Sequence, residues 1–306
     1  MKNWISLSAV ALTSLLVFCQ CSRSKTTEDF NEQNVMTAAD ESEIQDELNK
    51  SKTIIYTLPA PVEVATLIKQ SGVKYDEDLL NNVSKSASYD SKLKMALNLG
   101  VYSTDMSFAN IFNQSQKTME YITSLKQLTE RLGIVQIIDE ETINKFEAQG
   151  TSKDDMMNII SDVYMNANQY LSENNRKNLA VAVMVGGWTE GLYIALNIIN
   201  NSDKVNKQLT ERIISQKLSL STVMSILDDN NPNNEDEDLT YLYQKMYEIK
   251  VIYDQVRVEP KEKVVAETDA EARVTHIKAE VQSEISPEVL SMLCDKVNEV
   301  RSEFVK

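Results

Sequence analysis

The sequence predicts an all-α protein, a multi-helix bundle followed by a C-terminal helical arm. Of its 306 residues, only 7 are glycine and 5 are proline. Average proteins contain roughly 12 % of the two together, so this chain is poor in the residues that form tight turns. Apolar residues also recur at alternating steps of three and four, which places them on one face of a helix. Both observations favour long helices over short strands.

The composition indicates a globular and acidic chain. Hydrophobic residues make up 42 % and charged residues 25 % of the sequence, which is enough apolar material for a sizeable core. The formal net charge is −15. A negative surface repels phosphate backbones, so we expect no nucleic-acid partner. Solubility alone accounts for the acidity; a basic protein or a divalent cation is the alternative.

The first 18 residues have the pattern of a signal peptide. Lys2 supplies a positive charge, and an apolar run extends from Trp4 to Phe18. This run is too short and too close to the N-terminus for an ordinary membrane-spanning helix. The leader therefore predicts export from the cytoplasm.

The leader ends at two closely spaced cysteines, Cys19 and Cys21, with Leu16 three residues before the first. This arrangement resembles the lipobox of Gram-negative bacterial lipoproteins, in which the leader is cut before a cysteine that is then acylated. The resemblance covers about twenty residues and implies a lipid anchor at Cys19, with Cys21 as the alternative site. Neither cysteine follows the small residue that the family prefers. No acidic run follows in Ser22–Lys25, which favours an outer-membrane protein facing the periplasm. A plain signal peptide is the competing interpretation.

The mature chain divides into three expected parts. Residues 19–52 are polar and acidic and carry few large apolar residues, which is typical of a flexible tether between lipid and domain. Residues 53–258 form the helical core domain. Residues 259–306 form a charged segment and a C-terminal helical arm.

Local start and stop signals place the first helices of the core. Pro61 opens the first helix, because proline suits the first helical position, and Gly72 is its expected C-cap. A largely apolar helix over 91–112 follows. The next helix, over 115–132, carries apolar residues at steps of three and four and is closed by Gly133.

The second half of the core continues in the same way. A short helix over 140–149 precedes one that begins at Ser152, where Asp155 completes a start like a capping box. Pro260 stops the last helix of the core. The remaining helices are expected over 179–199, 203–216, 222–227 and 239–256.

The C-terminal segment shows two narrow apolar stripes. Ser286, Pro287 and Glu288 are a strong helix start, because a cap, a proline and an acid follow one another. Narrow stripes are typical of a coiled-coil seam, so we expect an appended helical arm. The stripes consist of Val274, Ile277, Val281 and Ile285, and then of Leu290, Leu293, Val297, Val300 and Phe304.

Two pairs of segments resemble each other inside the chain. Leu99–Ser103 is similar to Val185–Thr189 at an offset of 86 residues, and Lys126–Arg131 recurs as Lys207–Arg212 at an offset of 81. A diverged tandem duplication of a helical pair with one insertion would explain both. Ordinary similarity between amphipathic helices is the alternative.

Most candidate chemistry has a simpler structural explanation. The single histidine, His276, has no evident nucleophile or acid partner beside it. The acidic stretch 228–238 lacks the glycine and the closing glutamate of a calcium loop. Cys294 borders an apolar stripe and is expected to be a buried small hydrophobe. We therefore predict no catalytic residue, no metal site and no cofactor.

The most apolar mature segment, Leu179–Ile199, contains Glu190 as its only charge. Its small residues recur every four positions, which permits close approach of another backbone. A central buried helix is the preferred interpretation, and a membrane span is the alternative. The small-residue face consists of Val183, Gly187, Gly191 and Ala195.

Glu190 is the ionisable residue of greatest interest, because a carboxylate in an apolar helix is costly unless it is paired. Asp105 occupies nearly the matching place in the first segment of the internal repeat, and Tyr102 and Trp188 match each other there. These four residues form a candidate ligand or buried polar site. Two functions follow: a non-enzymatic binding or scaffolding module with an envelope protein partner, or a hydrolase that uses Glu190 and Asp105 for acid–base chemistry. The hydrolase requires both carboxylates at one open cleft.

Overall fold

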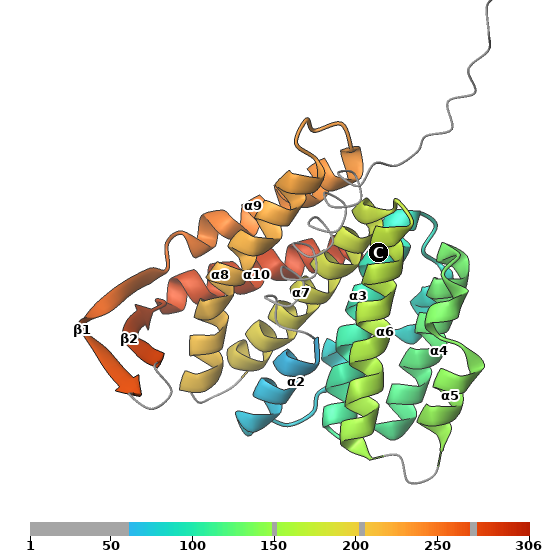
Figure 1. The fold of residues 1–306 in the computed structure, drawn as a ribbon, viewed down its shortest axis with the longest axis horizontal. Helices are drawn as coiled ribbons and strands as arrows, with labels where there is room; N and C mark the ends of the chain where they lie inside the picture. The colour runs from blue at the N-terminus through green and yellow to red at the C-terminus, as the bar shows by residue number, and fades with distance from the viewer. Residues whose placement is uncertain (1–60, 149–151, 202–205, 270–273) are drawn as a thin grey trace, which may run out of the picture. The chain divides into compact units, whose positions relative to one another are not determined.

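The computed structural model describes residues 61–148, 152–201, 206–269 and 274–306 (Figure 1). The leader, Cys19, Cys21 and the tether lie outside these residues. The described helices are α2 (Pro61–Gln70), α3 (Lys92–Ile111), α4 (Ser115–Leu132), α5 (Glu140–Glu147), α6 (Lys153–Glu173), α7 (Lys177–Asn200), α8 (Lys207–Asn230), α9 (Glu237–Tyr253) and α10 (Pro287–Phe304). Short 3-10 turns occupy Glu77–Leu79, Val83–Ala87 and Val135–Ile137. The predicted all-α multi-helix bundle is confirmed.

Helices α3 and α7 form the centre of the bundle. Helix α3 packs against α2, α4, α6 and α7, and α7 also contacts α8, α9 and α10. Helix α7 is the one described helix long and apolar enough to cross a membrane by length and composition, yet 94 % of its apolar window is buried by the rest of the protein. The expectation of a central core helix over 179–199 is therefore confirmed.

The central helices cross where their backbones touch. A Cβ atom at Gly100 of α3 would overlap the carbonyl oxygen of Val183 in α7. A Cβ atom at Gly186 of α7 would overlap the carbonyl oxygen of Leu97 in α3. Gly186 lies 86 residues after Gly100, and Val183 lies 86 residues after Leu97, so the two contacts are related by the offset of the similar segments. The crossing is thus nearly two-fold symmetric. The predicted four-residue stripe included Gly187, which lies at this crossing, but it missed Gly186.

The crossing bears on the predicted internal duplication. The first pair of similar segments lies at equivalent places, near the middle of α3 and of α7. The second pair does not, because Lys126–Arg131 ends α4 whereas Lys207–Arg212 begins α8. The equivalence of α3 and α7 is local to the crossing, and duplication of a helical pair stays a prediction.

Three predicted helix ends agree with the observed caps, whereas the two helices expected over 203–216 and 222–227 are one helix, α8, and α9 ends at Tyr253 before Pro260. The Ser152 hydroxyl accepts a hydrogen bond from the Asp155 backbone N–H at 3.1 Å. The Ser286 hydroxyl accepts one from the Val289 N–H, with Pro287 at the first helical position. Gly133 closes α4 with a left-handed φ of 71°. Each signal acts within one turn of the chain, which is why the sequence alone locates it.

The helical interpretation of the charged segment after residue 258 is wrong. Residues Arg257–Asp269 form strand β1 and Val274–Glu284 form strand β2, paired as an antiparallel hairpin. The pairing places residues 275, 277, 279 and 281 at alternate positions of β2, and all of these are uncharged. A period of two therefore runs through the segment. Val274, Ile277 and Val281 also fit a helical period, which misled the sequence analysis.

The prediction that the C-terminal helix is an arm appended to the bundle is also wrong. Helix α10 packs against α7 and α9 within the bundle (Figure 1). Its apolar stripe is in the core, and Cys294 is buried and free as predicted. The stripe is narrow because other residues of α10 face solvent or form polar contacts with the bundle. Its buried members include Leu293, Val297, Val300 and Phe304.

Candidate functional site

Two of the predicted site residues, Asp105 of α3 and Glu190 of α7, meet in the core. Both side chains are fully buried, with 0 % exposure. A third residue that the sequence analysis missed, Arg301 of α10, completes the group. Its Nε donates to Glu190 Oε2 at 2.9 Å and its Nη2 donates to Oε1 at 2.8 Å. This two-point pairing is the strongest geometry available to a carboxylate and an arginine.

The surroundings of Asp105 favour its neutral form. Burial raises the pKa of Asp105 well above its usual range, and the negative charge of Glu190 raises it further, whereas Arg301 and the Asn81 N–H lower it. We infer that Asp105 is protonated beside the Glu190–Arg301 ion pair, so that the cluster of Asp105, Glu190 and Arg301 is neutral overall.

Arg301 is fixed on a second side by an aromatic ring. Its guanidinium carbon lies 4.4 Å from the ring centroid of Tyr193, one turn after Glu190 on α7. Burial lowers the pKa of Arg301, but the charge and hydrogen bonds of Glu190 outweigh it and the net shift is upward. The arginine therefore stays charged and joins α10 to the central helix.

Asn81 connects this cluster to the rest of the core. Its backbone N–H donates to Asp105 Oδ2 at 3.0 Å, and its side-chain amide donates to Tyr89 Oη and Asn98 Oδ1 at 2.9 and 3.1 Å. Its carbonyl accepts from the Tyr121 hydroxyl at 2.9 Å. A buried hydrogen-bonded network of this kind favours a single core arrangement, although Asp105 Oδ1 has no hydrogen-bond partner among the described residues.

Tyr102, the third predicted site residue, belongs to the same network. Its hydroxyl donates to the Asn82 carbonyl at 2.9 Å and lies 3.4 Å from the Tyr89 hydroxyl. Burial raises the pKa of Tyr102, so it serves as a neutral hydrogen-bond donor. Asp105, Glu190 and Tyr102 thus share one closed polar core.

The closed geometry of the Asp105–Glu190 pair does not suit acid–base catalysis. Both Glu190 oxygens are occupied by Arg301, and neither carboxyl of the Asp105–Glu190 pair has exposed surface. A hydrolase needs its two carboxyl groups to reach a substrate and a water molecule in a cleft. The pair instead has the arrangement expected of a buried polar site that holds three helices together.

Asp105→Asn should gain stability relative to wild type as the pH rises. Because the pKa of Asp105 is raised in the folded state, the stability linked to its proton is complete below about pH 4 and is lost as pH rises towards the folded pKa. An asparagine amide is neutral like the protonated carboxyl and can still accept the hydrogen bond from the Asn81 N–H. Urea denaturation should therefore give nearly equal stabilities at pH 4 and a gain for Asp105→Asn of up to about 1.4 kcal/mol per pH unit above that.

A second aspartate supplies a control of opposite sign. Asp139 caps α5, and the hydrogen bond from the Thr142 N–H lowers its pKa. Its stabilisation is present above the unfolded pKa and is lost as the pH falls through the folded pKa. Asp139→Asn should therefore lose stability relative to wild type only as the pH rises to about 4, and its difference from wild type should be constant from pH 4 to 8. A difference between Asp105→Asn and wild type that is constant from pH 4 to 8 would contradict a protonated Asp105.

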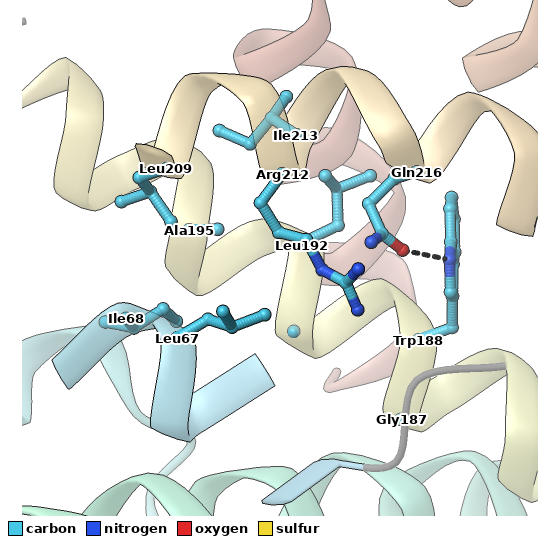
Figure 2. Close-up of a pocket in the computed structure, with 11 residues that line it drawn as sticks. Leu67, Ile68, Gly187, Trp188, Leu192, Ala195, Leu209, Arg212, Ile213 and Gln216 are labelled. Carbon is cyan, nitrogen blue, oxygen red and sulfur yellow. Dashed lines mark hydrogen bonds between the residues drawn. The ribbon is translucent and has the colours of Figure 1, made fainter. Parts of the chain in front are cut away.

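Trp188, the fourth predicted site residue, lies apart from this network in a pocket between α2, α7 and α8 (Figure 2). Its indole N–H donates to Gln216 Oε1 at 3.1 Å. The inner cavity measures about 20 Å³ and is largely apolar. It is lined by Leu67 and Ile68 of α2, by Gly187, Trp188, Gly191, Leu192 and Ala195 of α7, and by Leu209, Arg212, Ile213 and Gln216 of α8.

A wider groove adjoins the inner cavity and shares three of its residues. The groove measures about 340 Å³ and lies between α2 and α8. Five of its seven lining residues are polar or charged, unlike those of the inner cavity. Its residues are Leu67, Gln70, Gln208, Leu209, Glu211, Arg212 and Ser215.

Arg212 is the cation of this pocket. Figure 2 shows its side chain entering from α8, with the guanidinium group directed towards α7. Its Nε is buried and has no hydrogen-bond partner among the described residues. A buried charged donor without a partner is costly, so Arg212 marks a place where a ligand acceptor would be favoured.

Other sequence candidates have structural places. His276 lies on β2 opposite Glu267 of β1, and Asp236, from the acidic stretch 228–238, caps α9 by accepting from the Leu239 N–H at 3.0 Å. Burial raises the pKa of the Cys294 thiol. Within the described ranges no group of three or more His, Cys, Asp or Glu residues could hold a metal ion.

Comparison with protein families, with curated proteins and with solved structures finds no match to this chain. The chemistry of its residues is therefore the basis for the functional proposal that follows.

Proposed function

We propose that this chain is a lipid-anchored cell-envelope protein that acts as a non-enzymatic binding module. The anchor is supported by the leader of residues 1–18 and the lipobox-like cysteine Cys19. The expected place is the periplasmic side of the outer membrane, with an envelope protein as partner. The mature chain is acidic and carries its folded domain on a tether of residues 19–52, an arrangement suited to reaching a partner away from the lipid surface.

One observation carries the non-enzymatic part of the proposal: the Glu190 carboxylate is buried and fully occupied by Arg301. The ionisable residues best suited to acid–base catalysis thus stabilise the core. The pocket beside Trp188, by contrast, adjoins an open groove and contains a cationic group with an unused donor. Recognition is the task that this distribution of groups supports best.

Cys19→Ala should release the protein from the membrane into the soluble periplasmic fraction. Two or three acyl chains on one residue anchor a protein stably, and none can be attached without the thiol. Fractionation of cells that express wild type, Cys19→Ala or Cys21→Ala measures this directly. Release by Cys21→Ala alone would move the anchor to Cys21, and membrane retention of the double variant would contradict the lipid anchor.

Site-specific photo-crosslinking in intact cells tests the binding role. A photoreactive residue in place of Leu218, which is 77 % exposed, or Val135, which is 56 % exposed, should yield a discrete crosslinked species in the envelope. Absence of any such species from probes over the whole described surface would argue against a binding module. So would a hydrolytic activity that Glu190→Gln abolishes while the fold is unchanged.

A further inference from the structure

We propose that the pocket between α2, α7 and α8 binds the free C-terminal carboxylate of a peptide that ends in a small apolar residue. This inference rests on the proposed binding function and names its ligand class. Three features of the pocket lead to it: a cation without a partner at Nε, a small apolar cavity, and a groove with amide and hydroxyl side chains that adjoins it.

The guanidinium group of Arg212 favours a carboxylate as the ligand group. Arg212 carries a buried Nε donor with no partner in the described part of the chain. A carboxylate can accept two parallel hydrogen bonds from a guanidinium group. The inner cavity contains no acidic residue that could compete for Arg212, so the pairing would be available to a ligand.

The inner cavity selects the size of the last side chain. Leu192 and Ala195 of α7 face Leu209 and Ile213 of α8 across it. Its volume of about 20 Å³ is close to that needed for one water molecule. A methyl group fits such a space, whereas a leucine or phenylalanine side chain would have to displace the wall. An alanine-like terminal residue is therefore favoured.

The outer groove distinguishes a peptide from a fatty acid, the other common carboxylate with an apolar body. Gln70, Gln208 and Ser215 line this groove of about 340 Å³. Their amide and hydroxyl groups satisfy the donors and acceptors of a peptide backbone, whereas a hydrocarbon chain in the groove would cover these groups and leave them without partners. Glu211 also lines the groove and would disfavour an acidic residue upstream of the terminus.

The protein contains a built-in reporter for this pocket. Its two tryptophans are Trp4 and Trp188, and the first lies in the leader. The mature chain with Cys19→Ala therefore has Trp188 as its only tryptophan, on the wall of the cavity and bonded to Gln216. A ligand that enters the cavity should change the Trp188 emission.

The experiment titrates this soluble mature chain with the peptide acetyl-Gly-Gly-Gly-Ala and with its C-terminal amide. The free acid should give a saturable change in Trp188 emission. The amide should bind at least about tenfold more weakly, since a hydrogen-bonded ion pair is lost. Equal binding of acid and amide, binding of decanoate but not of the peptide, or binding of neither would each overturn the proposal.

Matched variants assign the effect to the pocket. Arg212→Gln should weaken binding of the acid at least about tenfold, whereas Lys207→Gln, the same charge change at an exposed position of α8, should leave it unchanged. Ala195→Leu should block binding by filling the cavity. Thermal unfolding identifies variants that fail to fold. Arg212→Lys keeps the charge but loses the two-point geometry, so it tests whether binding of the acid depends on that geometry. Crosslinks that persist in cells while every peptide fails would refute the ligand class and leave the binding module standing.

Discussion

Gly186→Ala is expected to lower the free energy of unfolding by about 3 kcal/mol or more. The new Cβ would overlap the backbone carbonyl of Leu97, and backbone atoms in a packed helix cannot move aside as a flexible side chain can. Gly100→Ala should have a similar effect, because its Cβ would overlap the carbonyl of Val183. Urea denaturation monitored by circular dichroism measures both changes.

Gly133→Ala is the matched control for the helix crossing. Gly133 adopts a left-handed conformation at the end of α4, and a Cβ atom added there would meet no neighbouring atom within 4 Å. Alanine should therefore cost only about 1 kcal/mol of conformational strain at this position. A loss at Gly186 or Gly100 no larger than the loss at Gly133 would show that α3 and α7 do not touch through their backbones.

Arg301→Met is expected to destabilise the protein by about 3–5 kcal/mol at neutral pH. The substitution keeps an unbranched apolar side chain but leaves the buried Glu190 carboxylate with no cation, next to Asp105. Urea denaturation at neutral pH gives the magnitude.

Two further variants complete this test. Lys296→Met on the same helix removes only partly exposed ion pairs with Glu248 and Glu299, so it should cost at most about 1 kcal/mol. Adding Glu190→Gln to Arg301→Met should recover much of the lost stability, since no buried charge then remains unpaired. Equal losses for Arg301→Met and Lys296→Met would contradict the buried ion pair.

Sequence and structure agree best where the determining interactions are local. Ser152 and Ser286 begin helices and Gly133 ends one through groups within about one turn of the backbone. The spacing of apolar residues indicates which side of a helix is buried. The length and apolarity of residues 179–199 were enough to identify the central helix. These properties were available without knowledge of any partner segment.

The sequence therefore determined, by itself, an all-α bundle, several of its helix ends and its central helix, and it identified Asp105 and Glu190 as a candidate pair. Only the tertiary structure decided the pairing of residues 257–284 as strands, because Val274, Ile277 and Val281 satisfy both periods and the hydrogen bonds of a hairpin join separate segments. The same holds for Arg301, which lies 111 residues from Glu190 and has no local signal of its role. Arg212 and Trp188 likewise line one pocket only because α7 and α8 pack together. Local backbone geometry depends on neighbouring residues, whereas the neutralisation of a buried charge depends on which distant helix packs against it.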